Sequence, residues 1–455
     1  MKLTLLGGGG VRSPLFVYSA LMRAQALQLN ELCLMDIDPL KLEVFGGISQ
    51  MLVEQAHSPV KLSLTTSADE ALTGADFVIT SIRVGMEPAR ILDEHIALRH
   101  NLLGQETTGP GGFAMASRSI PALLEYAQRL AQLNPKAWMI NFTNPAGLVT
   151  QALRDAGFER TVGICDSANA AQNMAAYWLE VQPAILRAEV FGLNHLSWGR
   201  RVWLGERDVL PNLLADPLFR ANTHLNLFDA DLILHLGMYL NEYLYYYYYP
   251  EQAVRMVQAA EETRGEEVLL LNHQLLSDLQ KIDLRKNPDE ARRIYTAYFA
   301  KRTATYMPFV RPENAVLPKV VKRHLTDEID EGYAGVAFNL IQALQSGEPL
   351  YTALNVPNQG AIDCMQPGDV VEVSCRVDAD GIHPLPIGAV PEGQELLMRS
   401  VKRYERLAAQ AILTRSRVLA VDALMAHPLV QSYGLAKILV DEYLQAHAAY
   451  LGQWN

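Results

Sequence analysis

The chain has 455 residues, of which 49% are hydrophobic and 20% charged, and its formal net charge is −11. This length predicts two or three domains rather than one small core. The negative balance disfavours a nucleic-acid-binding surface, and four scattered cysteines disfavour a disulfide framework. No run of about 20 apolar residues is present, and the run Leu3–Leu6 is too short for the core of a signal peptide. We therefore expect a cytoplasmic protein that binds neither nucleic acid nor membrane.

Short apolar runs alternate with helical patterns through the first third of the chain. Strands that alternate with helices are typical of a parallel, doubly wound sheet, so we expect a Rossmann-like, NAD-binding domain over residues 1–190. The predicted strands are Leu3–Leu6, Leu32–Met35, Phe77–Ile82, Trp138–Phe142 and Thr161–Ile164, and predicted helices include Leu15–Leu27, Pro121–Leu133 and Pro145–Ala156.

Longer helical patterns dominate after about residue 190. A β-rich stretch with turn signals on both sides interrupts them. This half predicts a second, mixed α/β domain over residues 191–455, which would bind substrate and metal. The predicted helices are Phe228–Tyr249, Glu261–Leu279, Asn287–Lys301 and a block over Glu392–His447, and the β-rich stretch is Val370–Val377.

A run of glycines follows the first predicted strand and precedes a helical pattern. Glycines there let backbone N–H groups approach a pyrophosphate at a helix N-terminus. Asp36 ends the second strand, where a carboxylate accepts hydrogen bonds from a ribose hydroxyl and repels a 2′-phosphate, so NAD is favoured over NADP. Arg12 stands where the motif has its third glycine, and a plain tight turn is the alternative interpretation. The glycines are Gly7, Gly8, Gly9 and Gly10.

A thiol and an imidazole are candidates for a metal site. Cys165 ends the fifth predicted strand, at the edge where such sheets bind ligands, and His195 lies in FGLNHLSWG. A thiolate with an imidazole suits a borderline divalent metal. A buried cysteine and a hydrogen-bonded core histidine is the alternative interpretation, although Asp166 and Asn194 make the surroundings polar.

Two loops carry polar side chains that do not fit a core. Gly104–Gly112 has four glycines and one proline, and it can present backbone donors and Glu106 to a ligand. Asn144, in NFTNPAG, is expected to cap the helix that opens at Pro145. Capping does not explain Asn141.

Arginine holds phosphate bidentately better than lysine does, which makes Arg83, Arg90 and Arg264 candidates, although single arginines are often solvated surface residues. Arg83 directly follows the third predicted strand and is expected to contact the cofactor. Tyr243 precedes the run Tyr245–Tyr249, whose rings a helix would spread around its axis. The pattern alone does not make Tyr243 a base.

With these residues assembled, the sequence resembles glycoside hydrolase family 4, the NAD- and metal-dependent glycosidases, over most of its length. GQETTGPGGF and NFTNPAG look most like the 6-phospho-β-glucosidase branch. The resemblance implies a lactate/malate dehydrogenase-like fold, NAD and a divalent metal (usually Mn²⁺) as cofactors, and a homodimer or homotetramer. It is carried by GGGGVRSP, SIRVGMEPARILDE, GQETTGPGG, NFTNPAG, GICDSA, FGLNHLSWG, NEYLYYYYYP with TRGEEV, and NVPNQGAI.

The resemblance also implies a route that differs from the two-carboxylate mechanism of most glycosidases. The sugar is oxidised at C3 by NAD⁺, a tyrosine removes the C2 proton, the C1 substituent is eliminated, water adds, and the hydride returns to C3. A ketone at C3 acidifies the C2 proton, and a Lewis acid stabilises the enediolate. The implied substrate is a phosphorylated disaccharide or glucoside.

The resemblance assigns a role to each candidate residue. Tyr243 matches the tyrosine base, with Tyr239 and Tyr245 as rivals inside the tyrosine-rich segment. Asp166 stands where β-specific members usually carry asparagine, and it matches a carboxylate that can protonate the leaving oxygen in members that cleave 6-phospho-α-glucosides. The other matches are Cys165 and His195 as metal ligands, Arg90, Asn144 and Arg264 as substrate-binding residues, and Asp36 as the ribose-binding residue.

Several functions therefore stay open beside the favoured 6-phospho-β-glucosidase. Within the family they are a 6-phospho-α-glucosidase and an α-galactosidase or α-uronidase that acts on unphosphorylated glycosides. Outside it they are an NAD-dependent 2-hydroxy-acid dehydrogenase, which would accumulate NADH without a metal, and a non-catalytic NAD or sugar-phosphate sensor.

Overall fold

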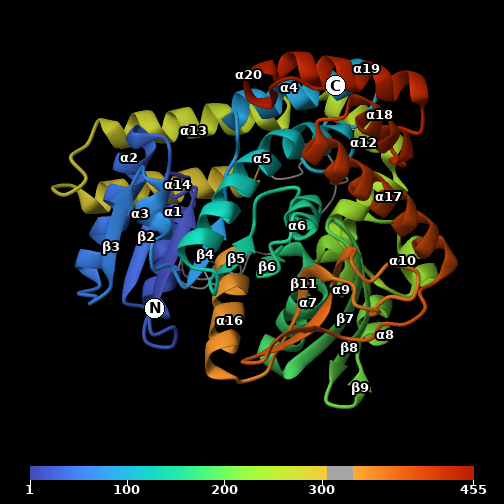
Figure 1. The fold of residues 1–455 in the computed structure, drawn as a ribbon. Coiled ribbons are helices and arrows are strands. Elements are labelled where there is room, and N and C mark those ends of the chain that lie inside the picture. Colours follow the sequence, from blue (N-terminus) through green and yellow to red (C-terminus); the bar gives the residue numbers. More distant parts are fainter. Residues whose placement is uncertain (305–331) are drawn as a thin grey trace.

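The computed structural model describes residues 1–304 and 332–455, and within them nine strands form one sheet (Figure 1). The six strands of the N-terminal half are parallel and lie in the order 3-2-1-4-5-6, which is the order of a dinucleotide-binding fold. Three antiparallel strands from the C-terminal half extend this sheet. Across the sheet the strands are β13 (Gly381–Pro384), β12 (Val370–Asp378), β11 (Leu350–Pro357), β6 (Thr161–Gly163), β5 (Trp138–Asn141), β4 (Phe77–Thr80), β1 (Lys2–Leu6), β2 (Glu31–Met35) and β3 (Lys61–Thr65).

Helices connect the parallel strands, and local sequence fixes where several of them begin. Asp38 starts one helix, because its carboxylate accepts the N–H groups of Leu40 and Lys41 and Pro39 suits the first turn. The connecting helices are α1 (Ser13–Met22), α2 (Pro39–Gln55), α3 (Ala68–Leu72), α4 (Met86–Arg99), α5 (Pro110–Leu133), α6 (Ala146–Asp155) and α7 (Ala170–Leu179), with the 3₁₀ turns η1 (Ser167–Asn169) and η2 (Pro183–Ile185).

A smaller antiparallel sheet and a set of helices complete the described C-terminal half. The strands are β7 (Leu186–Leu193), β8 (Leu196–Leu204), β9 (Arg207–Asp208) and β10 (Tyr239–Leu240). The helices and turns are α8 (Leu210–Ala215), α9 (Pro217–Ala221), η3 (His224–Leu227), α10 (Ala230–Leu236), η4 (Glu242–Leu244), α11 (Tyr245–Tyr248), α12 (Pro250–Ala259), α13 (Arg264–Gln280), α14 (Pro288–Ala304), α16 (Tyr333–Ser346), α17 (Glu392–Thr414), α18 (Arg417–Ala426), α19 (Tyr433–Ala446) and α20 (Ala448–Leu451).

The two halves of the chain share one hydrophobic core. Helix α16 packs against α1, α17 packs against α5 and α6, and α13 lies along α4 (Figure 1). The main buried cluster accordingly draws residues from both halves. The division of the chain at residue 190 stays a prediction, because β11, β12 and β13 complete the sheet of the first half. Among the described residues, no helix is both long enough and apolar enough to cross a membrane.

The five predicted strands are present, and so is the doubly wound arrangement, but β3 was not predicted. Its sequence, KLSLT, has no continuous apolar run, because an edge strand is only partly buried. The helix predicted over Pro121–Leu133 begins earlier, at Pro110. Its first turn packs so tightly on the preceding loop that a Cβ atom at Gly111 would lie 2.3 Å from the carbonyl oxygen of Gln105.

The prediction of one helix over Phe228–Tyr249 is wrong. Helix α10 ends at Gly237, whose φ of +62° is left-handed and terminates the helix. β10 then pairs with β8, and Asn241 opens η4 by accepting the N–H group of Tyr243. The apolar residues thus follow a helical pattern across a point where the helix ends, and Tyr243 lies on a turn.

Candidate active site

The glycine run forms a tight turn between β1 and α1, and each of its first three glycines is required. A Cβ atom at Gly7 would lie 2.2 Å from the carbonyl oxygen of Ser81, and one at Gly8 would lie 2.7 Å from the side chain of Leu34. Gly9 touches the carboxylate of Asp36, which accepts its N–H group at 2.8 Å. The predicted ribose-binding acid therefore lies directly against the predicted phosphate-binding loop.

The start of α1 leaves its N-terminal end open to an anion. Arg12 occupies the N-cap position with no side-chain hydrogen bond to the helix, and its side chain is exposed. The N–H groups of Gly7–Gly10 and of Ser13 bond acceptors within the protein. The features that fit a dinucleotide pyrophosphate are therefore the close backbone approach that the glycines allow and the positive end of the helix dipole.

Two predicted arginines meet at one carboxylate. Arg83, just after β4, forms an ion pair with Glu106, and Nη1 of Arg90 lies 3.1 Å from Oε2 of the same carboxylate. Burial raises the pKa of Glu106, but the two guanidinium groups outweigh it and lower the pKa to about 2. Glu106 was expected to face a ligand, and the structure turns it toward these arginines.

The N-terminus of α13 brings Arg264 toward the same cluster. Thr263 caps the helix in a reciprocal capping box with Glu266. In the first turn of α13, the N–H group of Gly265 donates to Oε2 of Glu94 at 2.9 Å. The other oxygen of this carboxylate, Oε1, accepts Nε–H of Arg90 at 2.7 Å. The carboxylate of Glu94 thus joins the side chain of Arg90 to the backbone beside Arg264, whose own guanidinium bonds Glu267 and the carbonyl of Arg302.

His195 lies in the two-residue connection between β7 and β8, and its ring is buried. Its Nδ1 lies 3.0 Å from the hydroxyl of Thr107, which donates its own proton to Oε1 of Gln105. The hydroxyl then accepts Nδ1–H of the imidazole, and this tautomer leaves Nε2 with a free lone pair. Burial also lowers the pKa of His195 to about 3, which keeps the ring neutral near pH 7.

Tyr243 stacks face to face on His195, with ring centroids 3.6 Å apart and an interplanar angle of 1°. The two rival tyrosines lie elsewhere. Tyr239 is buried on β10 against Phe219, and the Tyr245 hydroxyl contacts Gln252 and Met256 of α12. Of the three, Tyr243 is the one whose ring contacts a predicted metal ligand.

Cys165 lies two residues after the end of β6, in a negatively charged environment. Burial and then the carboxylates of Glu372, Asp166 and Glu242 raise the pKa of its thiol well above the usual range. A bound cation reverses this effect, because a coordinating thiol is deprotonated. Asp166 caps the turn η1 and stays partly exposed.

The donors at Cys165 and His195 fit a divalent transition metal. A sulfur in a negative environment and an imidazole with a free Nε2 lone pair are donors that such ions accept. Among the described residues, no group of three or more His, Cys, Asp or Glu side chains is arranged around one point as a complete ligand set. Two protein ligands would leave coordination positions for water or substrate, as in catalytic sites.

Asn144 is not a helix cap, which corrects the prediction. Helix α6 begins at Ala146 with Pro145 in the N-cap position and no side-chain cap. Asn144 is partly exposed between β5 and α6, so its amide is available to a ligand. Asn141, by contrast, is fully buried, and its side-chain amide bonds both the carbonyl and the N–H group of Thr143. These bonds give Asn141 a structural role in the turn.

Two residues that the sequence reasoning did not identify complete the surroundings. Thr107 orients His195, and Glu372 accepts a hydrogen bond from Asn194, the residue before His195. An acidic residue inside the apolar run VVEVSC is a signal for Glu372, since a strand core normally excludes carboxylates. No local pattern distinguishes Thr107 from the other polar residues of its loop.

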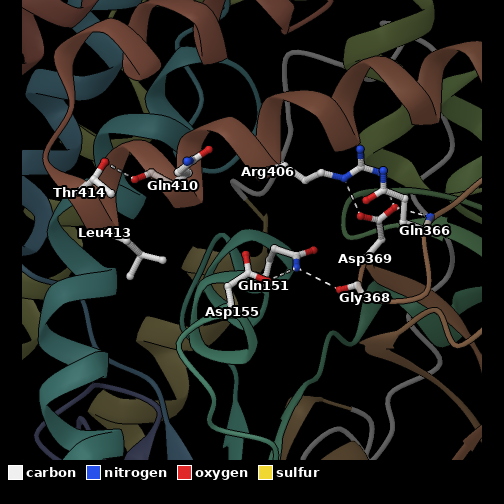
Figure 2. A pocket seen from close by; sticks show the side chains of 9 residues that line it. All are labelled: Gln151, Asp155, Gln366, Gly368, Asp369, Arg406, Gln410, Leu413 and Thr414. Atoms are coloured by element: carbon white, nitrogen blue, oxygen red, sulfur yellow. Dashed lines mark hydrogen bonds and ion pairs between the residues drawn. The ribbon is translucent and has the colours of Figure 1, made fainter.

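A pocket of about 380 Å³ lies apart from these clusters, between α6, α17 and the segment before β12 (Figure 2). None of the predicted site residues lines it. Its polar groups bond one another, as in the ion pair between Arg406 Nε and Asp369 Oδ1 at 2.6 Å. The lining residues are Gln151, Asp155, Gln366, Gly368, Asp369, Arg406, Gln410, Leu413 and Thr414.

The fold and these clusters define a Rossmann-type nucleotide-binding protein with a polar site at the carboxyl ends of its parallel strands. Two family models cover most of the chain: the family 4 glycosyl hydrolase matches residues 2–181, and its C-terminal domain matches residues 190–430. The chain belongs to family 4 of the glycosyl hydrolases, which confirms the family predicted from the sequence.

Relatives of both anomeric specificities align along the whole chain. A probable 6-phospho-β-glucosidase of Bacillus subtilis (strain 168) is 31% identical over 464 residues, which cover 100% of this chain and 98% of the relative. A phospho-α-glucosidase of Clostridium acetobutylicum is 27% identical over 474 residues, with coverages of 100% and 98%.

Solved structures confirm the predicted fold class. The 6-phospho-β-glucosidase of Thermotoga maritima with manganese, NAD⁺ and glucose-6-phosphate has a TM-score of 0.81 and 27% identity, and 99% of each chain is covered. Malate dehydrogenase from Plasmodium falciparum has a TM-score of 0.51 and 12% identity, with coverages of 91% and 98%, and shares the fold alone.

Proposed function

We propose that this enzyme hydrolyses 6-phospho-glucosides, with 6-phospho-β-glucosides favoured, by NAD-dependent oxidation at C3, elimination, water addition and re-reduction. One observation carries the proposal: two adjacent residues of one loop contact the arginine cluster and the stacked His195–Tyr243 pair. Glu106 pairs with Arg83 and Arg90, while Thr107 bonds the ring of His195 that stacks on Tyr243. Phosphate-binding groups and a candidate base therefore lie around one loop, as binding of a phosphorylated sugar requires.

NAD and a divalent cation, probed first as Mn²⁺, are the proposed cofactors. When bound, NAD supplies reversible hydride acceptance at C3, and the cation supplies Lewis-acid stabilisation of the negative charge that develops at C2 and C3. Gly7–Gly10 would cradle the pyrophosphate, Asp36 would bind the ribose hydroxyls, and Arg83 would contact the cofactor. Cys165 and His195 would hold the cation.

The remaining roles follow from charge and position. Arg90 and Arg264 bind the 6-phosphate, because Glu94 holds Arg90 beside the start of α13, where Arg264 lies, and guanidinium groups bind phosphate bidentately. Asn144 hydrogen-bonds sugar hydroxyls. Tyr243 removes the C2 proton, and the stacking of its ring on the neutral ring of His195, a proposed metal ligand, supports this role.

A 6-phospho-α-glucosidase is the second candidate, and Asp166 favours it. A partly exposed carboxyl group next to Cys165 can act as a general acid toward the leaving oxygen of an α-glucoside. The cytoplasmic location and the homodimeric or homotetrameric state expected from the sequence stay predictions.

Release of p-nitrophenol from the α- and β-anomers of p-nitrophenyl glucoside 6-phosphate tests the proposal, with NAD⁺ and Mn²⁺ added together and each withheld. We expect release that needs both additives and accumulates no NADH, and the faster anomer decides between the two candidates. Equal release without NAD⁺, or cleavage of the unphosphorylated glucosides alone, would refute the proposed function.

A further inference from the structure

The turn that carries His195 is strained, and buried residues on both sides hold it. Asn194 and His195 form the connection between β7 and β8, and His195 has a φ of +61°. A residue with a side chain rarely adopts this left-handed conformation, and such strain persists only where the surroundings fix it. The contacts of the turn therefore decide where the imidazole points.

Glu372 makes those contacts from β12. Its side chain is fully buried, Oε1 accepts Nδ2 of Asn194 at 3.1 Å, and Oε2 accepts the hydroxyl of Ser197 at 2.7 Å. Asn355, its partner across the ladder, donates to Oε1 at 3.1 Å. The carboxylate thus binds the residue before His195 and the second residue after it.

The same network reaches the segment of the proposed base. The hydroxyl of Ser197 accepts Nδ2 of Asn241 at 3.3 Å, and Oδ1 of Asn241 accepts the backbone N–H group of Tyr243 at 2.9 Å. Both members of the stacked His195–Tyr243 pair are therefore connected to Glu372.

Within the described part of the chain, the carboxylate of Glu372 accepts hydrogen bonds from three neutral donors and pairs with no cation. Burial, with a smaller contribution from the carboxylate of Glu242, raises the pKa of Glu372 to about 7. A buried carboxylate without a cation is costly, and packing alone would be better served by a neutral residue. Cys165, at the proposed metal site, lies close enough to interact with it electrostatically. A divalent cation at Cys165 and His195 would supply the missing positive charge.

We propose that Glu372 is a positioning residue for the metal: its carboxylate fixes the turn of His195 through Asn194 and Ser197 and supplies negative charge near Cys165. This inference rests on the proposed function, because it requires a cation at Cys165 and His195. Partners that orient metal ligands typically change metal affinity by about 10- to 100-fold when they are removed.

The test measures Mn²⁺ affinity of the full-length protein by equilibrium dialysis without substrate, together with NAD affinity and thermal stability. Glu372→Gln keeps the shape and removes the charge, and Asn194→Ala removes the link to the turn. Ser374→Ala is the matched control, since this buried β12 residue hydrogen-bonds β7 at Val190 and Ala188 rather than the His195 turn. We expect Kd for Mn²⁺ to rise at least tenfold in both test variants and to stay within twofold in the control, with NAD affinity unchanged in all three.

The other outcomes contradict either the role of Glu372 or the proposed metal site. Loss of thermal stability in the test variants with an unchanged Mn²⁺ affinity would show a purely structural role and overturn the inference. If Glu372→Gln does not fold, Asn194→Ala decides by the same criterion. If the wild type binds no Mn²⁺, or Cys165→Ser binds it equally well, the proposed metal site is wrong and the inference falls with it.

Discussion

Replacing Glu106 with glutamine tests whether the arginine cluster depends on this one carboxylate. The pKa of Glu106 lies at about 2 in the folded protein, against an ordinary value of 4.5. At about 1.4 kcal/mol per pH unit, this difference corresponds to about 3 kcal/mol of stability. Glutamine resembles the protonated acid, so Glu106→Gln should lower the free energy of unfolding by about that amount at pH 7.

The sign of the pH dependence follows from the lowered pKa. The stabilisation is complete above the unfolded pKa and is lost as the pH falls from about 4.5 toward about 2. The difference in unfolding free energy between wild type and Glu106→Gln should therefore shrink to about 2 kcal/mol at pH 4 and about 1 kcal/mol at pH 3. The measurement is urea unfolding followed by tryptophan fluorescence at each pH.

Glu125→Gln is the control, because Glu125 also pairs with an arginine but lies exposed on α5. Exposed pairs contribute little, so this variant should follow the wild type at each pH. A Glu106→Gln variant as stable as the wild type at pH 7, or a difference that stays constant down to pH 3, would refute the reasoning about the cluster.

Three further predictions concern catalysis and binding. Tyr243→Phe keeps the ring on His195 but removes the hydroxyl, so kcat should fall about 10²- to 10⁴-fold in the aglycone-release assay. The control variant Tyr245→Phe should keep a kcat near that of the wild type. Equal rates in both variants would exclude Tyr243 as the base. Arg264→Ala should raise KM about 10- to 100-fold for phosphorylated glucosides and leave unphosphorylated ones unchanged, and an equal, small effect on both would contradict the phosphate assignment. Asp36→Asn removes the charge that repels a 2′-phosphate, so the ratio of NAD to NADP affinity, measured by titration calorimetry, should fall about tenfold or more; an unchanged ratio would place the ribose elsewhere.

The nucleotide-binding half could be predicted because its signals are local. The run Gly7–Gly10 after an apolar strand and Asp36 after the next strand lie where the pattern places them, and the structure adds the contact between them. Edge strand β3 was missed because partial exposure removes the apolar run on which strand prediction depends.

The C-terminal half depends on distant contacts, and there the sequence was less informative. Helix α10 ends at Gly237, but the apolar residues on both sides of this glycine continue one helical pattern in the sequence. The sequence therefore did not predict β10 or the turn that carries Tyr243. Thr107 and Glu372 act on His195 from segments remote in sequence, and nothing in a single chain states that they meet. The resemblance supplied candidate metal ligands and a candidate base, but not the residues that contact them.

The most direct test of the central claim is catalysis in D₂O, with the glucose 6-phosphate product analysed by nuclear magnetic resonance. If Tyr243 removes the C2 proton before the C1 substituent leaves, the product acquires deuterium at C2 from solvent. Hydrolysis by direct displacement at C1 never breaks that C–H bond. We predict deuterium at C2 in the product formed with NAD⁺ and Mn²⁺ present, and a product that keeps its original C2 hydrogen would contradict the proposed mechanism.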